Sequence, residues 1–162
     1  MNLTLKTALC LIGFIWLLPV NLISWAFLCT LALFKQIEDV IFYDDFSIIW
    51  DVNNKSKFYK LMSGWYGFVL GSNIVCVDAR PRIQYITYIK HETAHIYQQY
   101  IFGILFYPLY ILMSLFIYFF MPSKLPYQDN LFEKWARSYA GQKVEIPEDK
   151  RREYLKDRWR WW

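Results

Sequence analysis

The residues best suited to chemistry lie in the stretch His91-Glu92-Thr93-Ala94-His95, which holds the only two histidines of the 162-residue chain. We expect it to lie on a helix over residues 81–106, where a separation of four places both imidazoles on one face, about one turn apart. Two imidazoles in that arrangement can occupy two corners of a tetrahedral zinc site. Glu92 is poorly placed to be a third ligand, but its carboxylate can take a proton from water at the metal.

A third ligand is needed, and Glu133 in the stretch Asn130-Leu131-Phe132-Glu133-Lys134-Trp135-Ala136 is the candidate. The two stretches together resemble the zincin metallopeptidases of the gluzincin branch, the thermolysin-like kind. These enzymes place an H-E-x-x-H helix beneath a small sheet and take a glutamate from N-x-x-E-x-x-A on a second helix. The resemblance covers about residues 65–140 and implies a bound Zn²⁺. Its ligands would be His91, His95 and Glu133.

The resemblance also implies the reaction, hydrolysis of a peptide or protein substrate. Zinc would lower the pKa of its water toward about 7, and Glu92 would take the proton and pass it to the leaving amine. Tyr127 would donate to the developing oxyanion, a role that gluzincins give to a Tyr or His, although it could instead pack in a loop. The metzincin branch is excluded, because Gln98 and Ile101 stand where it requires glycine and histidine.

Two alternatives use the same residues differently. The chain could be a non-catalytic zincin-like membrane protein that keeps the fold for binding or assembly. Glu133 could also form a capping box with Asn130 and bind no metal, because a carboxylate three residues after an N-cap can bond the N-cap amide. One carboxylate cannot serve as both cap and ligand.

Composition points to a membrane. The chain is 56% hydrophobic and 21% aromatic, far richer in apolar residues than an ordinary soluble domain, and we expect contact with membrane lipid. No Gly-rich phosphate loop or basic-aromatic strand pattern supports a nucleic-acid partner. Three cysteines without paired spacing make a disulfide framework improbable.

Residues 1–34 form the first apolar segment, which we interpret as a membrane anchor or hairpin because it is long enough for a bilayer core of about 30 Å. Pro19 and Asn21 interrupt it, so a kinked span and a re-entrant pair of half-length helices both remain open. A secretory signal is the third interpretation, although no clean cleavage site follows.

A second apolar run, residues 101–121, lies between His95 and Glu133. If this run simply crossed the bilayer, Glu133 would emerge on the opposite side from the histidines. A site with three ligands therefore predicts that the segment bends back near Tyr107-Pro108 or packs on residues 1–34. The alternative is a site inside the membrane, as in site-2 type proteases, but the Asp-Gly that usually supplies their third ligand is missing from this chain.

The expected fold is α+β, a minimal zincin-like domain over residues 35–145 that includes the apolar segment 101–121. Ile41 to Trp50 reads as strand, turn at Asp44-Asp45, strand. Gly64 to Val77 reads as a second strand pair broken at Gly71-Ser72-Asn73. The resulting small antiparallel sheet would support the H-E-x-x-H helix, whose cap we place at residues 78–81, and its edge could bind a peptide as an extra strand.

Residues 146–162 form a basic, Trp-rich tail that begins with a helix after Pro147. Interleaved basic and tryptophan side chains suit an anionic membrane surface, and the alternative is a solvated charged tail. Because positive residues near membrane segments stay on the cytoplasmic side, we expect the domain and the tail to face the cytoplasm from an inner or plasma membrane. Substrate and oligomeric state remain open.

Overall fold

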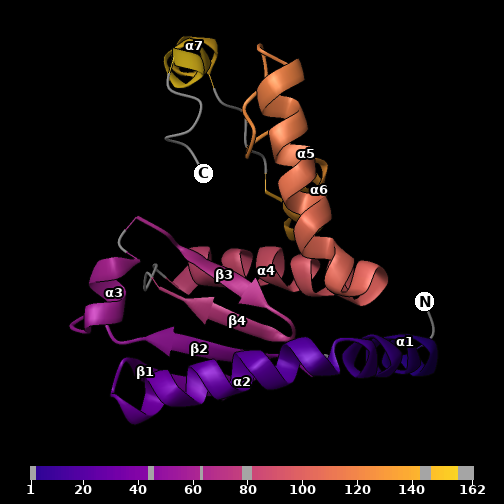
Figure 1. Ribbon diagram of the computed structural model, residues 1–162, viewed down its shortest axis with the longest axis vertical. Coiled ribbons are helices and arrows are strands. Elements are labelled where there is room, and N and C mark those ends of the chain that lie inside the picture. Colours follow the sequence, from indigo (N-terminus) through magenta and orange to yellow (C-terminus); the bar gives the residue numbers. More distant parts are fainter. Residues whose placement is uncertain (1–2, 44–45, 63, 78–81, 143–146, 157–162) are drawn as a thin grey trace.

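The computed structural model describes residues 3–43, 46–62, 64–77, 82–142 and 147–156. It is mixed α+β, with a four-stranded sheet lying between helices (Figure 1). Three sequence predictions fall outside the described residues. These are the turn at Asp44-Asp45, the helix cap at Asp78 to Pro81, and the Arg158 to Trp162 part of the tail.

The sheet consists of β1 (Ile37–Phe42), β2 (Ile48–Val52), β3 (Gly67–Leu70) and β4 (Asn73–Cys76), in the order β1-β2-β4-β3. Both predicted strand pairs are confirmed as antiparallel pairs. The expectation of a wholly antiparallel sheet is wrong, because β2 and β4 are parallel. Helix α3 (Lys57–Leu61) and β3 lie between them in the chain, so β4 re-enters beside β2 in the same direction.

One face of the sheet packs on α4 (Arg82–Phe102), the helix that carries the histidines. Successive strand side chains point to opposite faces, so Ile74 and Cys76 of β4 share the face toward α4. They form one buried cluster with Ile49 of β2 and with Tyr88, Ile89 and Ile96 of α4. Burying each large aliphatic side chain here contributes about 1.5–3 kcal/mol, so this core holds α4 rigidly on the sheet.

The other face of the sheet packs on α2 (Leu18–Leu33). Leu28 of α2 shares a buried cluster with sheet residues Trp50, Val52, Val75 and Val77. Helix α1 (Leu3–Trp16) precedes α2, and the apolar parts of the two helices meet at an angle of 73°. The N-terminal segment is therefore a bent pair rather than one straight span, and its second half is also a layer of the folded domain.

The connection from α4 to the next helix turns sharply. A 3₁₀ turn, η1 (Gly103–Leu105), separates α4 from α5 (Phe106–Phe120), which rises steeply away from α4 in Figure 1. Gly103 has φ 59°, and a Cβ there would meet the Trp16 indole at 1.8 Å. The bend therefore lies at Gly103, where glycine adopts a left-handed conformation easily. Pro108 does not cause it, because it sits in the first turn of α5, where proline is tolerated.

The chain then returns toward α4 through an irregular segment, residues 121–130, and α6 (Leu131–Ala140) packs on α4. Helix α7 (Glu148–Lys156) follows and is held to the return segment by an ion pair of 2.6 Å between Arg151 and Asp129. By length and composition, the helical run Tyr85–Phe120 could cross a membrane, and the bent pair formed by α1 and α2 could form a second, broken span.

A buried asparagine joins α2 to the sheet. The side chain of Asn73, which has no exposed surface, accepts hydrogen bonds from the indole N–H groups of Trp25 and Trp50 at 3.0 and 2.9 Å. Its amide nitrogen donates to Ser24 Oγ at 2.6 Å and to the Leu70 carbonyl at 3.2 Å. These four hydrogen bonds reach α2, β2 and β3, so the Asn73 side chain fixes the position of α2 on the sheet.

Asn73→Ala should therefore lower the free energy of unfolding by about 2–4 kcal/mol, because both indole donors lose their acceptor in a buried place. Thermal unfolding followed by circular dichroism in a mild detergent measures the effect. Asn54→Ala, a change at an exposed turn position, is the control and should shift stability by less than about 0.5 kcal/mol. Equal stability of the two variants would contradict the role of Asn73.

Asp129 links stability to pH. Burial opposes its charge, but the Leu125 amide, Lys134 and Arg151 together lower the pKa of Asp129 below its ordinary value. A carboxyl whose pKa is lower in the folded chain stabilises that chain above its unfolded pKa of about 3.9, and the effect disappears as pH falls through the folded value. Its stabilising effect is therefore present at neutral pH and lost in acid.

Asp129→Asn should be less stable than the native chain at pH 6, and the two should converge once the pH has fallen below the folded pKa of Asp129. Urea denaturation in detergent across this range is the measurement. Asp39→Asn, an exposed change on β1, serves as the control. A constant difference between Asp129→Asn and the native chain at all pH values would show that ionisation of Asp129 contributes nothing.

Candidate metal centre

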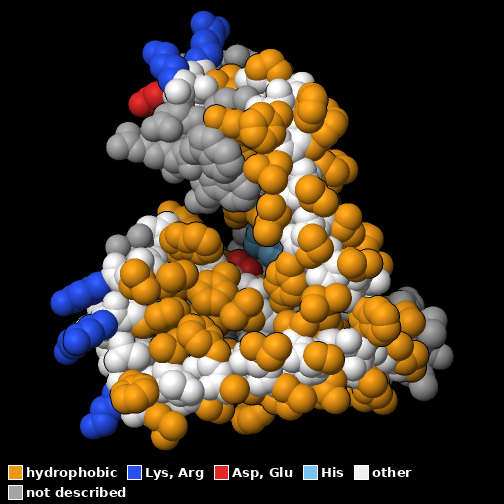
Figure 2. All heavy atoms as spheres, viewed as in Figure 1, with side chains coloured by type: hydrophobic (Ala, Val, Ile, Leu, Met, Phe, Trp, Pro, Cys, Tyr) orange, Lys and Arg blue, Asp and Glu red, His pale blue; other side chains and the backbone are white. Residues whose placement is uncertain are grey.

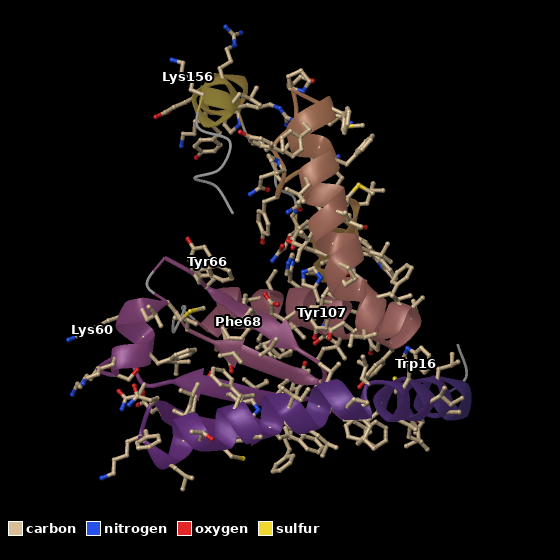
Figure 3. All side chains as sticks on the ribbon, viewed as in Figure 1. Trp16, Lys60, Tyr66, Phe68, Tyr107 and Lys156 are labelled. Carbon is tan, nitrogen blue, oxygen red and sulfur yellow. The ribbon has the colours of Figure 1, made fainter. Side chains whose placement is uncertain are left out.

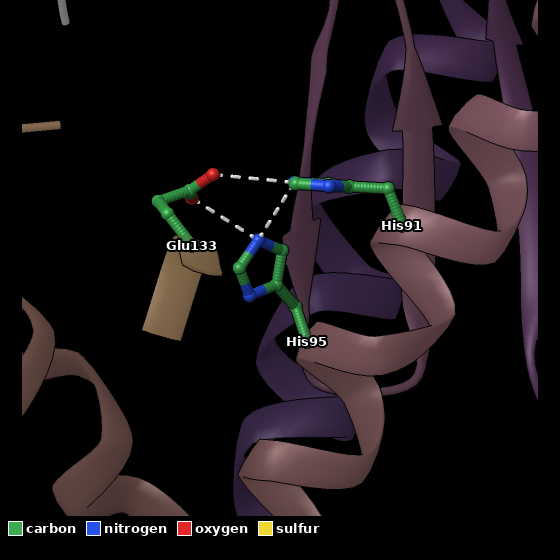
Figure 4. Close-up of side chains that lie close together, drawn as sticks. All are labelled: His91, His95 and Glu133. Carbon is green, nitrogen blue, oxygen red and sulfur yellow. Dashed lines mark hydrogen bonds and ion pairs between the residues drawn. The ribbon is translucent and has the colours of Figure 1, made fainter. Parts of the chain in front are cut away.

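The structure brings His91, His95 and Glu133 together as a buried group whose ligand atoms all lie within 4.8 Å of one another. The two histidines project from adjacent turns of α4, as their spacing predicted, and Glu133 reaches them from the first turn of α6 (Figure 4). Glu133 Oε2 lies 3.3 Å from His91 Nε2, and Glu133 Oε1 lies 3.2 Å from His95 Nε2. The two Nε2 atoms are 3.2 Å apart.

These distances fit a metal ion. Ligand atoms about 2.0–2.1 Å from a tetrahedral zinc lie roughly 3.3–3.4 Å from one another, close to the three separations observed here. A group of two imidazoles and a carboxylate is a common donor set for Zn²⁺. The geometry shows a place for a metal ion and leaves the identity of the metal open.

Gln98 sets the protonation of His95. Its amide nitrogen donates to the Phe132 carbonyl of α6 at 2.8 Å, which turns its oxygen toward His95 Nδ1, also at 2.8 Å. Nδ1 of His95 therefore carries a proton, and Nε2 is the ring nitrogen that faces the other two ligands. Gln98 thus supports a ligand, whereas its neighbour Gln99 accepts a bond from the Tyr107 hydroxyl at 2.7 Å.

Glu133 has two further partners that the sequence did not suggest. Tyr110 of α5 donates to Oε1 at 2.8 Å, and Arg137, one turn along α6, lies 3.4 Å from Oε2. Arg137 could have been noticed as a basic residue four positions after Glu133. Tyr110 could not, because only the turn at η1 brings α5 over the histidines.

Glu133 is ionised at neutral pH. Burial alone would raise its pKa, but hydrogen bonds from His91 and His95 lower the pKa of this carboxyl far below its ordinary value. A carboxylate that is 2% exposed requires compensating partners, since an unpaired buried charge is very unfavourable. The polar side chains around Glu133 supply that compensation.

The capping alternative for Glu133 is resolved by geometry. The Asn130 side chain caps α6 by accepting from the Phe132 amide at 2.9 Å, as the sequence suggested. In a capping box the backbone N–H of Asn130 would donate to Glu133. Here that N–H donates to the Tyr127 carbonyl at 3.2 Å. The carboxylate is thereby left to face the histidines. Ala136, on the next turn of α6, is fully buried, as expected for the small residue that lets α6 approach α4.

The two candidate catalytic residues lie at the same centre. Glu92 is buried, interacts electrostatically with both histidines and with Glu133, and bonds the side chain of Tyr88. Tyr127 bonds Glu133 from the return segment, and burial together with the nearby carboxylates raises the pKa of its hydroxyl well above the ordinary value. Tyr127 is therefore a protonated hydroxyl beside the candidate ligand.

The centre lies at the base of an opening in the surface. Figure 2 shows histidine and acidic side chains at the bottom of a hollow between the sheet half of the molecule and α5. The chain has no histidines other than the two candidate ligands, so this hollow leads to the centre.

No known protein family, curated protein or solved structure matches the chain.

Gln98→Ala should weaken zinc binding by about 10- to 100-fold, because His95 loses the acceptor that fixes its tautomer and ring orientation. Competition with a chromogenic chelator measures the affinity. Gln142→Ala, just beyond the end of α6, is the matched control and should bind zinc like the native chain. A folded Gln98→Ala protein with unchanged affinity would overturn the role given to Gln98.

Proposed function

We propose that the chain is a membrane-associated zinc metallopeptidase of the gluzincin-like kind. The observation that supports this most strongly is the convergence of His91, His95 and Glu133 at mutual distances of 3.2–3.3 Å beside a buried Glu92. In a hydrolytic zinc site, one set of residues holds the metal and a further carboxylate transfers protons. His91, His95 and Glu133 suit the first role, and Glu92 suits the second.

When bound, zinc lowers the pKa of water toward neutrality and polarises a carbonyl group. Glu92 accepts the proton from the attacking water and transfers it to the nitrogen of the leaving amine. Tyr127, with a hydroxyl that stays protonated, is positioned near the centre to donate to the developing oxyanion. Gln98 and Tyr110 orient His95 and Glu133.

Glu92→Gln separates chemistry from metal binding. It removes the proton acceptor and keeps the shape of the side chain, so we expect zinc content to stay near one ion per chain and hydrolysis to fall by about 10²–10⁴-fold. Elemental analysis and cleavage of a mixture of fluorescence-quenched peptides are the measurements. Glu38→Gln, an exposed change on β1, is the matched control and should retain both properties.

Glu133→Gln completes the comparison, because loss of the anionic ligand should reduce zinc content and hydrolysis together. The alternative function, a non-catalytic zincin-like protein for binding or assembly, is supported by the bond of Glu133 to Tyr110, which joins α6 to α5 without needing a metal. Equal behaviour of Glu92→Gln and the native chain toward every peptide would favour that alternative. Less than about 0.2 zinc per chain after purification without chelator would contradict both, because such sites hold zinc tightly.

A further inference from the structure

Helix α5 has one covered and one bare side. Phe106, Ser114 and Ile117 are buried on the side toward α6 and the return segment. Leu112, Phe116 and Phe119, on the opposite side, are 48–67% exposed. The outer surfaces of α1 and α2 are bare in the same way, with Ile12, Trp16 and Ile23 all above 60% exposed. Apolar surface on this scale marks a contact with something other than water.

None of the three bare helices is long enough to cross a bilayer alone. At 1.5 Å per residue, α1 with 14 residues, α2 with 16 and α5 with 15 extend about 21, 24 and 22 Å, compared with a hydrocarbon core of about 30 Å. The 73° angle between α1 and α2 prevents them from adding their lengths in one direction, and η1 breaks the run between α4 and α5.

The return segment argues more strongly against a crossing by α5. Asn130, at its end, donates to Ser114 Oγ at 2.8 Å and to the Tyr110 carbonyl at 3.2 Å. Residues 121–130 therefore come back along α5 without forming a helix. If α5 crossed the bilayer, this irregular backbone would cross the hydrocarbon beside it, where unpaired peptide groups are very unfavourable.

Charge is arranged at the periphery of the apolar surface. On the face in Figure 2, hydrophobic side chains gather over α1, α2 and α5, whereas Lys and Arg side chains project from the edges of the molecule. Figure 3 places Lys60 and Lys156 on two of these edges. Helix α7 contributes three exposed basic residues, Lys150, Arg152 and Lys156. Basic side chains around an apolar face match the headgroup layer of an anionic membrane.

We propose that α1, α2 and α5 embed in a single leaflet of an anionic bilayer without crossing it, and that α7 binds the headgroups of the same leaflet. An apolar hollow of about 710 Å³ beside α5 accommodates acyl chains of that leaflet. Its lining consists of Phe102, Phe132 and apolar residues of α5. The proposal rests on the membrane association stated under the proposed function and is independent of hydrolysis. The opening above the metal centre lies on the face in Figure 2 where the hydrophobic side chains gather, so substrate would approach along the membrane surface.

Double-cysteine labelling tests the topology. The three native cysteines are replaced by alanine, and cysteines are introduced at Lys60 and Ser123, exposed positions on either side of the run Tyr85–Phe120. The variant is reconstituted in sealed vesicles of phosphatidylcholine and phosphatidylglycerol, treated with a membrane-impermeant maleimide and weighed by mass spectrometry. If α5 stays in one leaflet, each chain carries two labels or none, whatever its orientation. If α5 crosses, each chain carries one label, which would overturn the proposal.

Lys57→Cys with Lys60→Cys, both on α3, is the matched control, because two sites on one short helix lie on the same side in any topology. In a second measurement, Lys150→Gln, Arg152→Gln and Lys156→Gln together should weaken co-sedimentation with these vesicles by roughly fivefold per charge removed, and leave binding to phosphatidylcholine alone unchanged.

Two further outcomes would replace lipid as the occupant of the bare helices. Failure of the chain to sediment with either vesicle would show that lipid does not cover them. Oligomerisation that protects the α5 cysteine of a Phe116→Cys variant from the reagent in vesicles and in detergent would assign the surface to a second copy. Either result overturns the membrane proposal, and neither bears on the Glu92 test of hydrolysis.

Discussion

The ionised carboxylate of Glu133 is the constraint on which the rest of the structure depends. A buried charge is tolerated only where partners replace its hydration, and here two imidazoles, a tyrosine hydroxyl and a guanidinium do so. Those partners come from α4, α5 and α6. Meeting them requires α6 to lie on α4, which in turn requires the chain to leave α4 at η1 and to return along α5.

Polar side chains specify the arrangement of a mostly apolar chain. Asn73 joins α2 to the sheet, Gln98 joins α4 to the backbone of α6, and Asn130 joins the return segment to α5. Apolar contacts supply much of the stabilisation, but they allow two helices to pack in many relative positions. A buried amide finds its hydrogen-bond partners in only one of these positions. Each of the three amides bonds two elements that are distant in sequence, and Gln98 and Asn130 help to fix the position of Glu133 relative to the histidines.

The same arrangement connects the metal centre to the proposed membrane surface. Tyr110 contacts Glu133 from the covered side of α5, while the opposite side of that helix is bare. The helix that orients a candidate ligand is therefore also a helix that we place in lipid. Helices α1, α2 and α5 are too short to cross a bilayer, which is consistent with insertion into one leaflet. The irregular return segment is also consistent with it, because peptide groups of this segment would be unpaired in hydrocarbon if α5 crossed.

The sequence by itself determined the local features of this protein. Histidines four residues apart on a helix had to share one face, the turn residues predicted both hairpins, and the capping role of Asn130 followed from its position three residues before Glu133. Only the tertiary structure decided how β4 pairs with β2, where the chain bends after α4, and that Glu133 faces the histidines rather than its own cap. These depend on contacts between residues far apart in the chain, such as Trp16 against Gly103 and Tyr110 against Glu133, which local spacing does not encode.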